Sequence, residues 1–109
     1  MSLYFSTQQQ ATTRELFPGV TAKVDCCRTM TVSVVTMKPE AVVPLHRHSH
    51  EQAGTVMSGS ALFEVGGESK ILKAGDMYHI PGGTLHRVTA EADGLVAIDV
   101  FHPVREEYC

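Results

Sequence analysis

The sequence predicts an all-β fold, either a sandwich or a barrel, and three observations support that class. Turn-forming residues interrupt the chain about every ten residues. The runs between them are short and rich in Val, Thr, Ile and Met, which suit a pleated strand. No internal repeat or linker divides the chain, so we interpret residues 1–109 as a single domain. The turn signals are Pro18-Gly19, Lys38-Pro39-Glu40, Ser58-Gly59-Ser60, Gly66-Gly67, Ala74-Gly75-Asp76, Pro81-Gly82-Gly83 and Asp93-Gly94.

The first predicted elements follow from these signals in chain order. The segment from Gln8 to Leu16 is compatible with a turn or a strand, and the sequence does not decide between them. The segment from Thr29 to Met37 is a run of strand-forming residues. The segments Ala61 to Val65 and Glu68 to Leu72 flank Gly66-Gly67, so they predict a hairpin whose two glycines can adopt positive φ.

The last predicted strand, Leu95 to Phe101, is apolar on both faces. Alternation places Val96, Ile98 and Val100 on one side. Asp99 lies on the other side with the remaining apolar residues. A strand that is apolar on both faces should be covered on both. We therefore expect the domain interior to cover one face and a second subunit to cover the other, which predicts a homodimer.

Composition excludes several classes of function. Of 109 residues, 43% are hydrophobic and 19% are charged, which is typical of a globular domain rather than a disordered or membrane protein. Nine Lys and Arg against twelve Asp and Glu give a net charge of −3 without a basic stripe, so nucleic acid is not an expected partner. The segment from Met1 to Gln10 has no cationic flank or long apolar run, and it predicts no signal peptide or membrane span.

The three cysteines, Cys26, Cys27 and Cys109, are an odd number without Cys-x-x-Cys spacing. The adjacent pair would face opposite ways on a strand, so the pattern offers neither a disulfide framework nor a thiol pair for a metal. We therefore expect reduced thiols in a cytoplasmic protein.

Two short stretches, Pro44 to Gln52 and Gly75 to His86, carry the residues that indicate chemistry. His46 and His48 are one residue apart, so on an extended strand both imidazoles point to the same face and can share one metal ion. His86 follows a Pro-Gly-Gly turn and can bring a third imidazole to that ion. The expected cofactor is one divalent transition metal, since Mn, Fe, Ni, Co, Cu and Zn all accept such donors.

A fourth ligand requires the chain to turn after His48. Six extended residues cover about 20 Å, so Gln52 reaches an ion held by His46 only if the chain reverses around residues 49–51. Glu51 and Gln52 then lie on opposite sides of the returning strand, and only one of them can coordinate. Glu51 is anionic and chemically the better ligand, whereas position favours Gln52. The remaining histidines, His50, His79 and His102, are expected to be partly exposed imidazoles, of which His50 or His102 could touch a substrate.

The C-terminal segment carries candidate substrate-binding groups. Asp99 and Phe101 share a strand face, and Arg105 follows Pro103, which ends the strand. If that face lines a cavity, Asp99 could transfer a proton and Arg105 could hold a carboxylate through two parallel hydrogen bonds. Spacing alone favours the alternative, in which Asp99 caps the strand end and Arg105 lies at the surface beside Glu106.

The two histidine stretches together resemble the motifs of the cupin family, G-x5-H-x-H-x3,4-E-x6-G and G-x5-P-x-G-x2-H-x3-N. The first is matched by His46, His48, Gln52 and Gly59, with Glu40 replacing its opening glycine. The second is matched by Gly75, Pro81, Gly83 and His86, with Ala90 replacing its asparagine. This resemblance implies a double-stranded β-helix, or jelly-roll barrel, whose metal-site core occupies residues 40–104.

The ending D-V-F-x-P-x-R-E resembles small cupins of the pectin-degradation (KdgF-like) type. That resemblance implies metal ligation by His46, His48, Gln52 and His86, and substrate contacts from Asp99, Phe101 and Arg105. Gln52 replaces the usual glutamate, so four neutral ligands would leave the charge of the ion uncompensated and favour an anionic substrate.

The same resemblance implies a metal-dependent isomerase that opens and ketonises 4,5-unsaturated monouronates from pectin or alginate breakdown. In this interpretation Asp99 moves protons. Two alternatives stay open, a ferrous dioxygenase of the cupin superfamily and a non-catalytic cupin that binds a small ligand.

Overall fold

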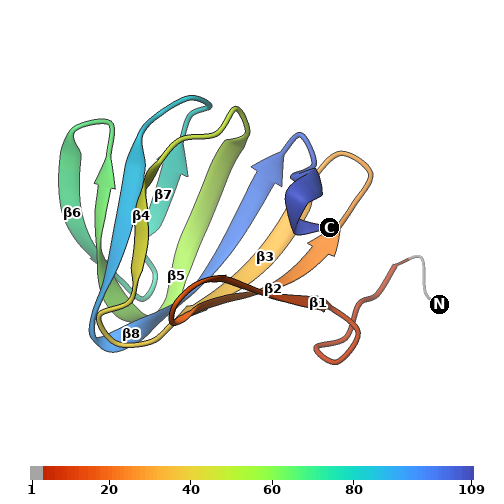
Figure 1. Ribbon diagram of the computed structural model, residues 1–109, viewed down its shortest axis with the longest axis horizontal. Coiled ribbons are helices and arrows are strands. Elements are labelled where there is room, and N and C mark those ends of the chain that lie inside the picture. Colours follow the sequence, from red (N-terminus) through yellow and green to blue (C-terminus); the bar gives the residue numbers. More distant parts are fainter. Residues whose placement is uncertain (1–3) are drawn as a thin grey trace.

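The computed structural model describes residues 4–109, so the first three residues of the Met1 to Gln10 segment lie outside the described range. Within that range the chain forms eight strands and one short 3-10 helix (Figure 1). No helix in the described range is long and apolar enough to cross a membrane. The elements are β1 (Thr12–Phe17), β2 (Val20–Cys26), β3 (Thr31–Met37), β4 (Val42–His46), β5 (Glu51–Val65), β6 (Glu68–Lys73), β7 (Met77–Ile80), β8 (His86–His102) and η1 (Glu106–Tyr108).

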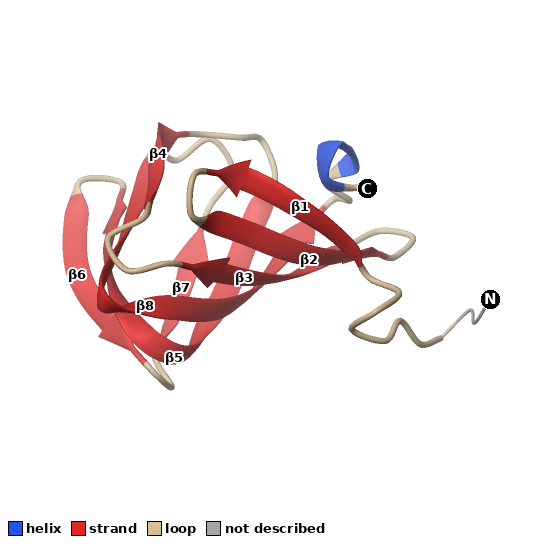
Figure 2. Ribbon diagram, turned by 60° about the horizontal axis from the view of Figure 1, so that its bottom comes forward, coloured by secondary structure: helices blue, strands red, loops and turns tan. Residues whose placement is uncertain are grey.

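The strands form one antiparallel sheet that folds onto itself as a barrel. Its strand order is β1-β2-β3-β8-β5-β6, with β4 paired to β8 and β7 paired to β5. The two longest strands, β5 and β8, change partners along their length, because β8 pairs with β4 at its start and with β3 at its end. Figure 2 shows the two resulting layers, with β1, β2 and β3 in front of β5 and β7. The all-β jelly-roll class predicted from the sequence is confirmed.

Two glycines form the corner at which β5 and β8 pass from one layer to the other. Gly59 has a φ of 73° and Gly94 a φ of 70°, in the left-handed region that glycine adopts without a steric penalty. A Cβ at Gly59 would lie 2.1 Å from the carbonyl oxygen of Gly94. Only glycine therefore fits at position 59, which explains why the first motif ends on this residue type.

The short-range predictions are confirmed at particular positions. Val65 pairs with Glu68 across Gly66 and Gly67, whose φ values of 56° and 86° make the predicted two-residue hairpin turn. The segment left undecided, Gln8 to Leu16, contains both structures, a turn at residues 8–10 and most of β1 from Thr12 onward. Glu40, which replaces the opening glycine of the first motif, has a φ of 66° and thus adopts a glycine-like conformation with a full side chain.

The core lies between the two layers. The inner face of the last strand is buried at Leu95, Ala97 and Phe101. Its outer face is only half-buried, and the neighbouring Val34, which pairs with Ile98, is 40% exposed. The apolar outer face on which the homodimer prediction depends is therefore partly exposed in the single chain. The homodimer itself stays a prediction.

Cys26 and Cys109 form a disulfide, with their Cα atoms 6.0 Å apart, so the expectation of reduced thiols is wrong for this pair. The two residues are 83 positions apart, and only the closure of the fold brings the C-terminal η1 turn against the end of β2. Arg14 also holds this turn, because its guanidinium donates hydrogen bonds of 2.9 Å to the carbonyl oxygens of Tyr108 and Cys109. Cys27 is a free thiol, as expected, and it is exposed.

Candidate metal centre

The three predicted histidines meet at one end of the barrel. His46 is the last residue of β4 and His86 the first of β8, and they lie directly opposite each other in the antiparallel ladder. His48 follows in the loop between β4 and β5. The ring centroids of His46 and His86 are 4.2 Å apart, and those of His48 and His86 are 5.0 Å apart. One nitrogen from each ring lies within 4.8 Å of the other two, close enough to share an ion.

Backbone carbonyl groups orient all three rings. Each Nδ1 contacts a main-chain oxygen two residues away, which can only accept a hydrogen bond. In a neutral ring that donates from Nδ1, the other nitrogen, Nε2, keeps its lone pair. This arrangement is typical of metal-binding histidines. The accepting oxygens belong to Pro44, Thr84 and His50, at 2.8, 2.8 and 3.0 Å respectively.

The surroundings keep two of these rings neutral. Burial, followed by the nearby positive charge of Arg105 and by His86, lowers the pKa of His48 to about 4. Burial also lowers the pKa of His86, assisted by His46 and Arg105. Neutral imidazole is the form that coordinates a metal, so His48 and His86 are available for coordination at neutral pH.

Gln52, and not Glu51, points towards the histidines. Gln52 is 8% exposed, and its Oε1 lies 3.1 Å from His48 Nε2. If His48 donates from Nδ1, both of these atoms are acceptors, and a cation between them would satisfy both lone pairs. Glu51 turns outward, where its Oε2 contacts His79 Nε2 at 3.0 Å. Three imidazoles and one amide oxygen therefore converge, a donor set that fits a divalent transition metal with further positions open.

The second motif supports the loop that carries His48. The Gly83 N–H donates a 2.8 Å hydrogen bond to the carbonyl oxygen of His48. A Cβ at Gly82 would lie 2.4 Å from the carbonyl oxygen of Ser49. The Pro-Gly-Gly turn thus holds the His48 loop at a distance that only glycine permits.

Asp99 lies inside β8 rather than at its end, and it faces the cavity below the histidines with 7% of its surface exposed. The Tyr78 hydroxyl donates a 2.5 Å hydrogen bond to Asp99 Oδ1. Burial raises the pKa of the Asp99 carboxyl group, although hydrogen bonds from Tyr78 and Gln52 oppose this shift. Asp99 is therefore a buried acid whose proton affinity is higher than that of an exposed aspartate.

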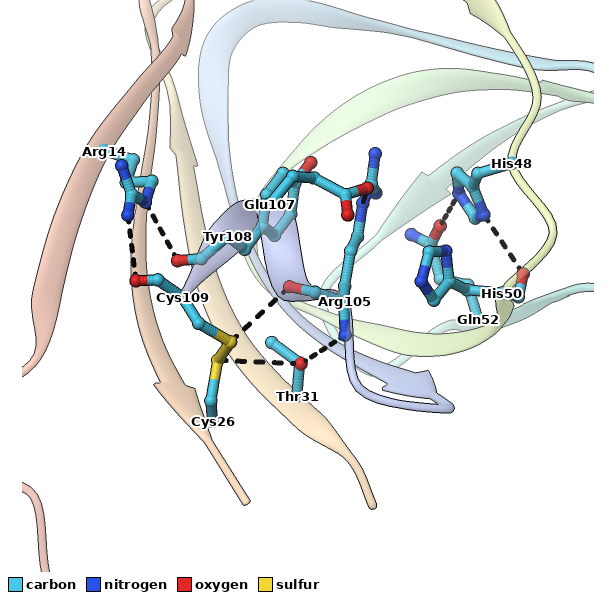
Figure 3. A network of polar contacts seen from close by, with 10 residues as sticks. All are labelled: Arg14, Cys26, Thr31, His48, His50, Gln52, Arg105, Glu107, Tyr108 and Cys109. Atoms are coloured by element: carbon cyan, nitrogen blue, oxygen red, sulfur yellow. Dashed lines mark hydrogen bonds and ion pairs between the residues drawn. A yellow bond between two sulfur atoms is a disulfide. The ribbon is translucent and has the colours of Figure 1, made fainter. Parts of the chain in front are cut away.

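Arg105 is enclosed by the C-terminal turn (Figure 3). Its side chain is 11% exposed, with the guanidinium carbon 4.9 Å from the ring centroid of Phe101 and 4.1 Å from that of Tyr108. Its Nε donates to Glu107 at 2.9 Å, and its backbone N–H donates to the Thr31 hydroxyl at 2.8 Å. Spacing alone favoured a surface position for Arg105. The structure instead encloses this side chain, because η1 folds back over the open end of the barrel.

One cavity, open to solvent, is lined by apolar residues of the barrel interior together with His46, Gln52, His86, Asp99, Phe101 and Arg105. Sequence reasoning missed Tyr78 and Tyr108, which also line it. A signal for Tyr78 was available, since strand alternation places it on the face opposite His79. Tyr108 had no such signal, because it lies in an irregular turn. The other histidines are peripheral: His50 is half-buried, with its ring centroid 5.6 Å from that of His48, whereas His79 and His102 are exposed.

Comparisons with known proteins agree with this architecture. A family model described as Cupin domain matches residues 33–101. The pectin degradation protein KdgF of Dickeya dadantii (strain 3937) is 38% identical over 64 residues, which are 58% of this chain and only 58% of the length of that relative.

Solved structures cover more of the chain. An RmlC-like cupin from Shewanella frigidimarina NCIMB 400 has a TM-score of 0.90 at 26% identity, covering 99% of this chain and 97% of that one. KdgF from Halomonas sp. has a TM-score of 0.89 at 26% identity, covering 99% and 100% respectively. Oxalate decarboxylase from Bacillus subtilis, a protein with Mn(II) centres, has a TM-score of 0.80 at 23% identity over 93% of this chain and 29% of its own, and this likeness concerns the fold alone.

Proposed function

Because the chain belongs to the cupin domain family, we propose that its histidine cluster serves a metal-dependent enzyme acting on a small anionic sugar acid. The proposed reaction is the ring opening and ketonisation of a 4,5-unsaturated monouronate from pectin or alginate breakdown. One observation carries the proposal: a buried acid, Asp99, and an enclosed cation, Arg105, line the same cavity as two of the converging imidazoles, His46 and His86. The likeness to KdgF proteins supports the substrate class.

The substrate carboxylate would bind to Arg105. The Nε of this residue is already bonded to Glu107 and its side chain also hydrogen-bonds to Tyr108, so the remaining guanidinium N–H groups would donate to the substrate carboxylate. His46, His48, His86 and Gln52 would hold the metal ion, which when bound supplies an electrophile that polarises the sugar oxygens. These four donors are neutral, so the charge of the ion would remain to attract an anion. Phe101 forms an apolar wall at the same site.

Asp99 would move a single proton. The anomeric hydroxyl gives its proton to Asp99 while the C1–O5 bond breaks and C1 becomes an aldehyde. The electron pair of that bond stays on O5 as an enolate, and Asp99 returns the proton to C4 as C5 becomes a ketone. No atom is gained or lost, so the reaction is an isomerisation. Burial raises the pKa of Asp99, which suits a group that must both accept and donate a proton.

The test is to incubate the metal-loaded protein with an unsaturated monouronate and follow the ultraviolet absorbance of the ring enol ether. We expect its loss to be faster than the spontaneous rate, and no acceleration would remove this substrate from consideration. Asp99→Asn is the matched variant, because it keeps the size of the side chain but cannot carry the proton. It should lower kcat by about 100-fold or more. Oxygen uptake would point instead to a dioxygenase, and ligand retention without product to a binding module.

Three further parts of this proposal concern organisation, assembly and location. Residues 1–109 would form a single cupin domain that pairs into a homodimer through the outer face of β3 and β8, which is half-buried on β8 and more exposed on β3. Sedimentation at micromolar concentration tests the homodimer, and a monomer would contradict it. The location would be cytoplasmic. The Cys26–Cys109 disulfide would be an exception there, because disulfides are rare in reducing compartments.

A further inference from the structure

A row of four residues crosses the sheet beside the metal centre. Strand register pairs Ser33 with Asp99, Asp99 with Gly54, and Gly54 with Tyr78, on β3, β8, β5 and β7. Neighbouring strands are about 4.8 Å apart, so two strand spacings, roughly 10 Å, separate the backbones of Asp99 and Tyr78. Their side chains nevertheless meet in a 2.5 Å hydrogen bond. The bond therefore spans the strand that lies between them.

Gly54 is the residue that lets these side chains meet. A Cβ at this position would lie 2.4 Å from the Tyr78 hydroxyl oxygen and 2.5 Å from Asp99 Oδ1. Its φ is outside the left-handed region, so the backbone conformation does not require glycine. Glycine inside a strand costs about 0.5–1 kcal/mol relative to alanine. Glycine is therefore present at a position where its lower intrinsic stability is offset by the contact between Tyr78 and Asp99, which a methyl group would prevent.

The direction of this hydrogen bond is fixed. Burial, together with the charge of Asp99, raises the pKa of Tyr78, so its hydroxyl stays protonated and acts as the donor. The ring of Tyr78 stacks on Phe63 with a centroid distance of 4.5 Å, which aims the hydroxyl. Asp99 Oδ1 thereby accepts from Tyr78, and the side chain of Gln52 forms a second hydrogen bond to the same carboxyl group.

We propose that Tyr78 is a positioning residue, whose hydroxyl holds Asp99 Oδ1 and so orients the carboxyl group that takes and returns the proton. This role rests on the proposed function, whereas the hydrogen bond itself can be tested without it. A tyrosine that served stability alone would change the melting temperature and leave the turnover number as it is. The proposal predicts instead that loss of the Tyr78 hydroxyl lowers the turnover number.

Tyr78→Phe is the central variant, because it keeps the ring against Phe63 and removes only the hydroxyl. We expect kcat to fall by about tenfold or more while KM changes by less than about twofold. Binding of a saturated monouronate, measured by calorimetry, should be unchanged. A wild-type kcat in this variant, or a raised KM with unchanged kcat, would overturn the proposal.

Two other variants test the same hydrogen bond from its neighbours. Gly54→Ala places a methyl group between Tyr78 and Asp99, 2.5 Å from Asp99 Oδ1, and it should lower kcat at least as much as Tyr78→Phe. Ser33→Ala is the matched control. It also removes a buried hydroxyl beside Asp99, but this hydroxyl has no hydrogen-bond partner, so kcat should stay within about twofold of the wild type. Equal losses in Ser33→Ala and Tyr78→Phe would overturn a specific role for Tyr78.

A measurement independent of turnover separates this inference from the proposed function. A hydroxyl donating to a carboxylate at this distance should give a downfield proton resonance in the NMR spectrum of the wild type. The resonance should be lost in Tyr78→Phe and Asp99→Asn and retained in Ser33→Ala. If the wild type does not accelerate the reaction, the proposed function fails, and this resonance alone decides whether Tyr78 holds Asp99. Its absence from the wild type would overturn the inference.

Discussion

Breaking the Cys26–Cys109 disulfide should destabilise the fold by several kcal/mol. The bond joins residues 83 positions apart. In the chain-entropy model, a loop of that length contributes about 4–5 kcal/mol, because the cross-link restricts the unfolded chain. Domains of this size are stable by only about 5–15 kcal/mol in total. The disulfide should therefore supply a large part of the free energy of unfolding.

The perturbation is Cys109→Ser, with Cys27→Ser as the matched control, because Cys27 is a free, exposed thiol one residue from the bridge. Urea denaturation should show a free energy of unfolding lower by about 4–5 kcal/mol in Cys109→Ser, and the melting temperature should fall by about 20 °C. Cys27→Ser should stay within about 0.5 kcal/mol of the wild type. A reductant should destabilise the wild type by a similar amount and leave Cys109→Ser unchanged.

The disulfide also bears on the cavity. It anchors η1, whose Tyr108 ring lies 4.1 Å from the Arg105 guanidinium carbon. Freed from β2, this turn should hold Arg105 less well, and affinity for a monouronate carboxylate should fall in Cys109→Ser. Three titratable thiols in the unfolded, unreduced wild type would refute the reasoning. So would equal stabilities of Cys109→Ser and Cys27→Ser.

Three further predictions concern single residues. Arg105→Ala should weaken the binding of a carboxylate ligand by about tenfold or more, and that of its neutral amide analogue much less; calorimetry tests this, and equal losses would argue against a carboxylate clamp. Glu40→Gly should stabilise the fold by up to about 1 kcal/mol, because the φ of 66° strains a residue with a side chain; Glu40→Ala keeps that strain and should show no gain in urea denaturation. Acidification of the metal-free protein should lower its stability as the pH falls from about 6.5 to about 4, because unfolded chains protonate His48 near 6.5 whereas the folded state lowers its pKa to about 4. A His48→Asn variant should lose less stability over that range in thermal unfolding, and an identical loss would contradict the assignment.

The local signals in the sequence were sufficient for the fold class and for the three histidines. The pair Gly66-Gly67 predicted the hairpin because a two-residue turn of this kind needs positive φ at both residues, which glycine adopts readily. His46 and His48 could be placed on one face because side chains alternate along a strand. The turn before Gln52 was predicted because an extended chain would place Gln52 too far from His46 to share an ion with it. Each of these inferences depends on residues that are close in the sequence.

The tertiary structure decided the contacts between distant residues. Position and the family resemblance favoured Gln52 over Glu51, but only the register of β5 shows that Gln52 turns inward and Glu51 outward. Tyr78 reaches Asp99 only because three strands align with a glycine between the two side chains. The Cys26–Cys109 bridge, and with it the enclosure of Arg105, depends on where the barrel leaves the chain end. Periodicity and turn chemistry are properties of neighbouring residues, whereas register and closure are set by the whole sheet, and for that reason the metal-binding face could be predicted from sequence but its supporting contacts could not.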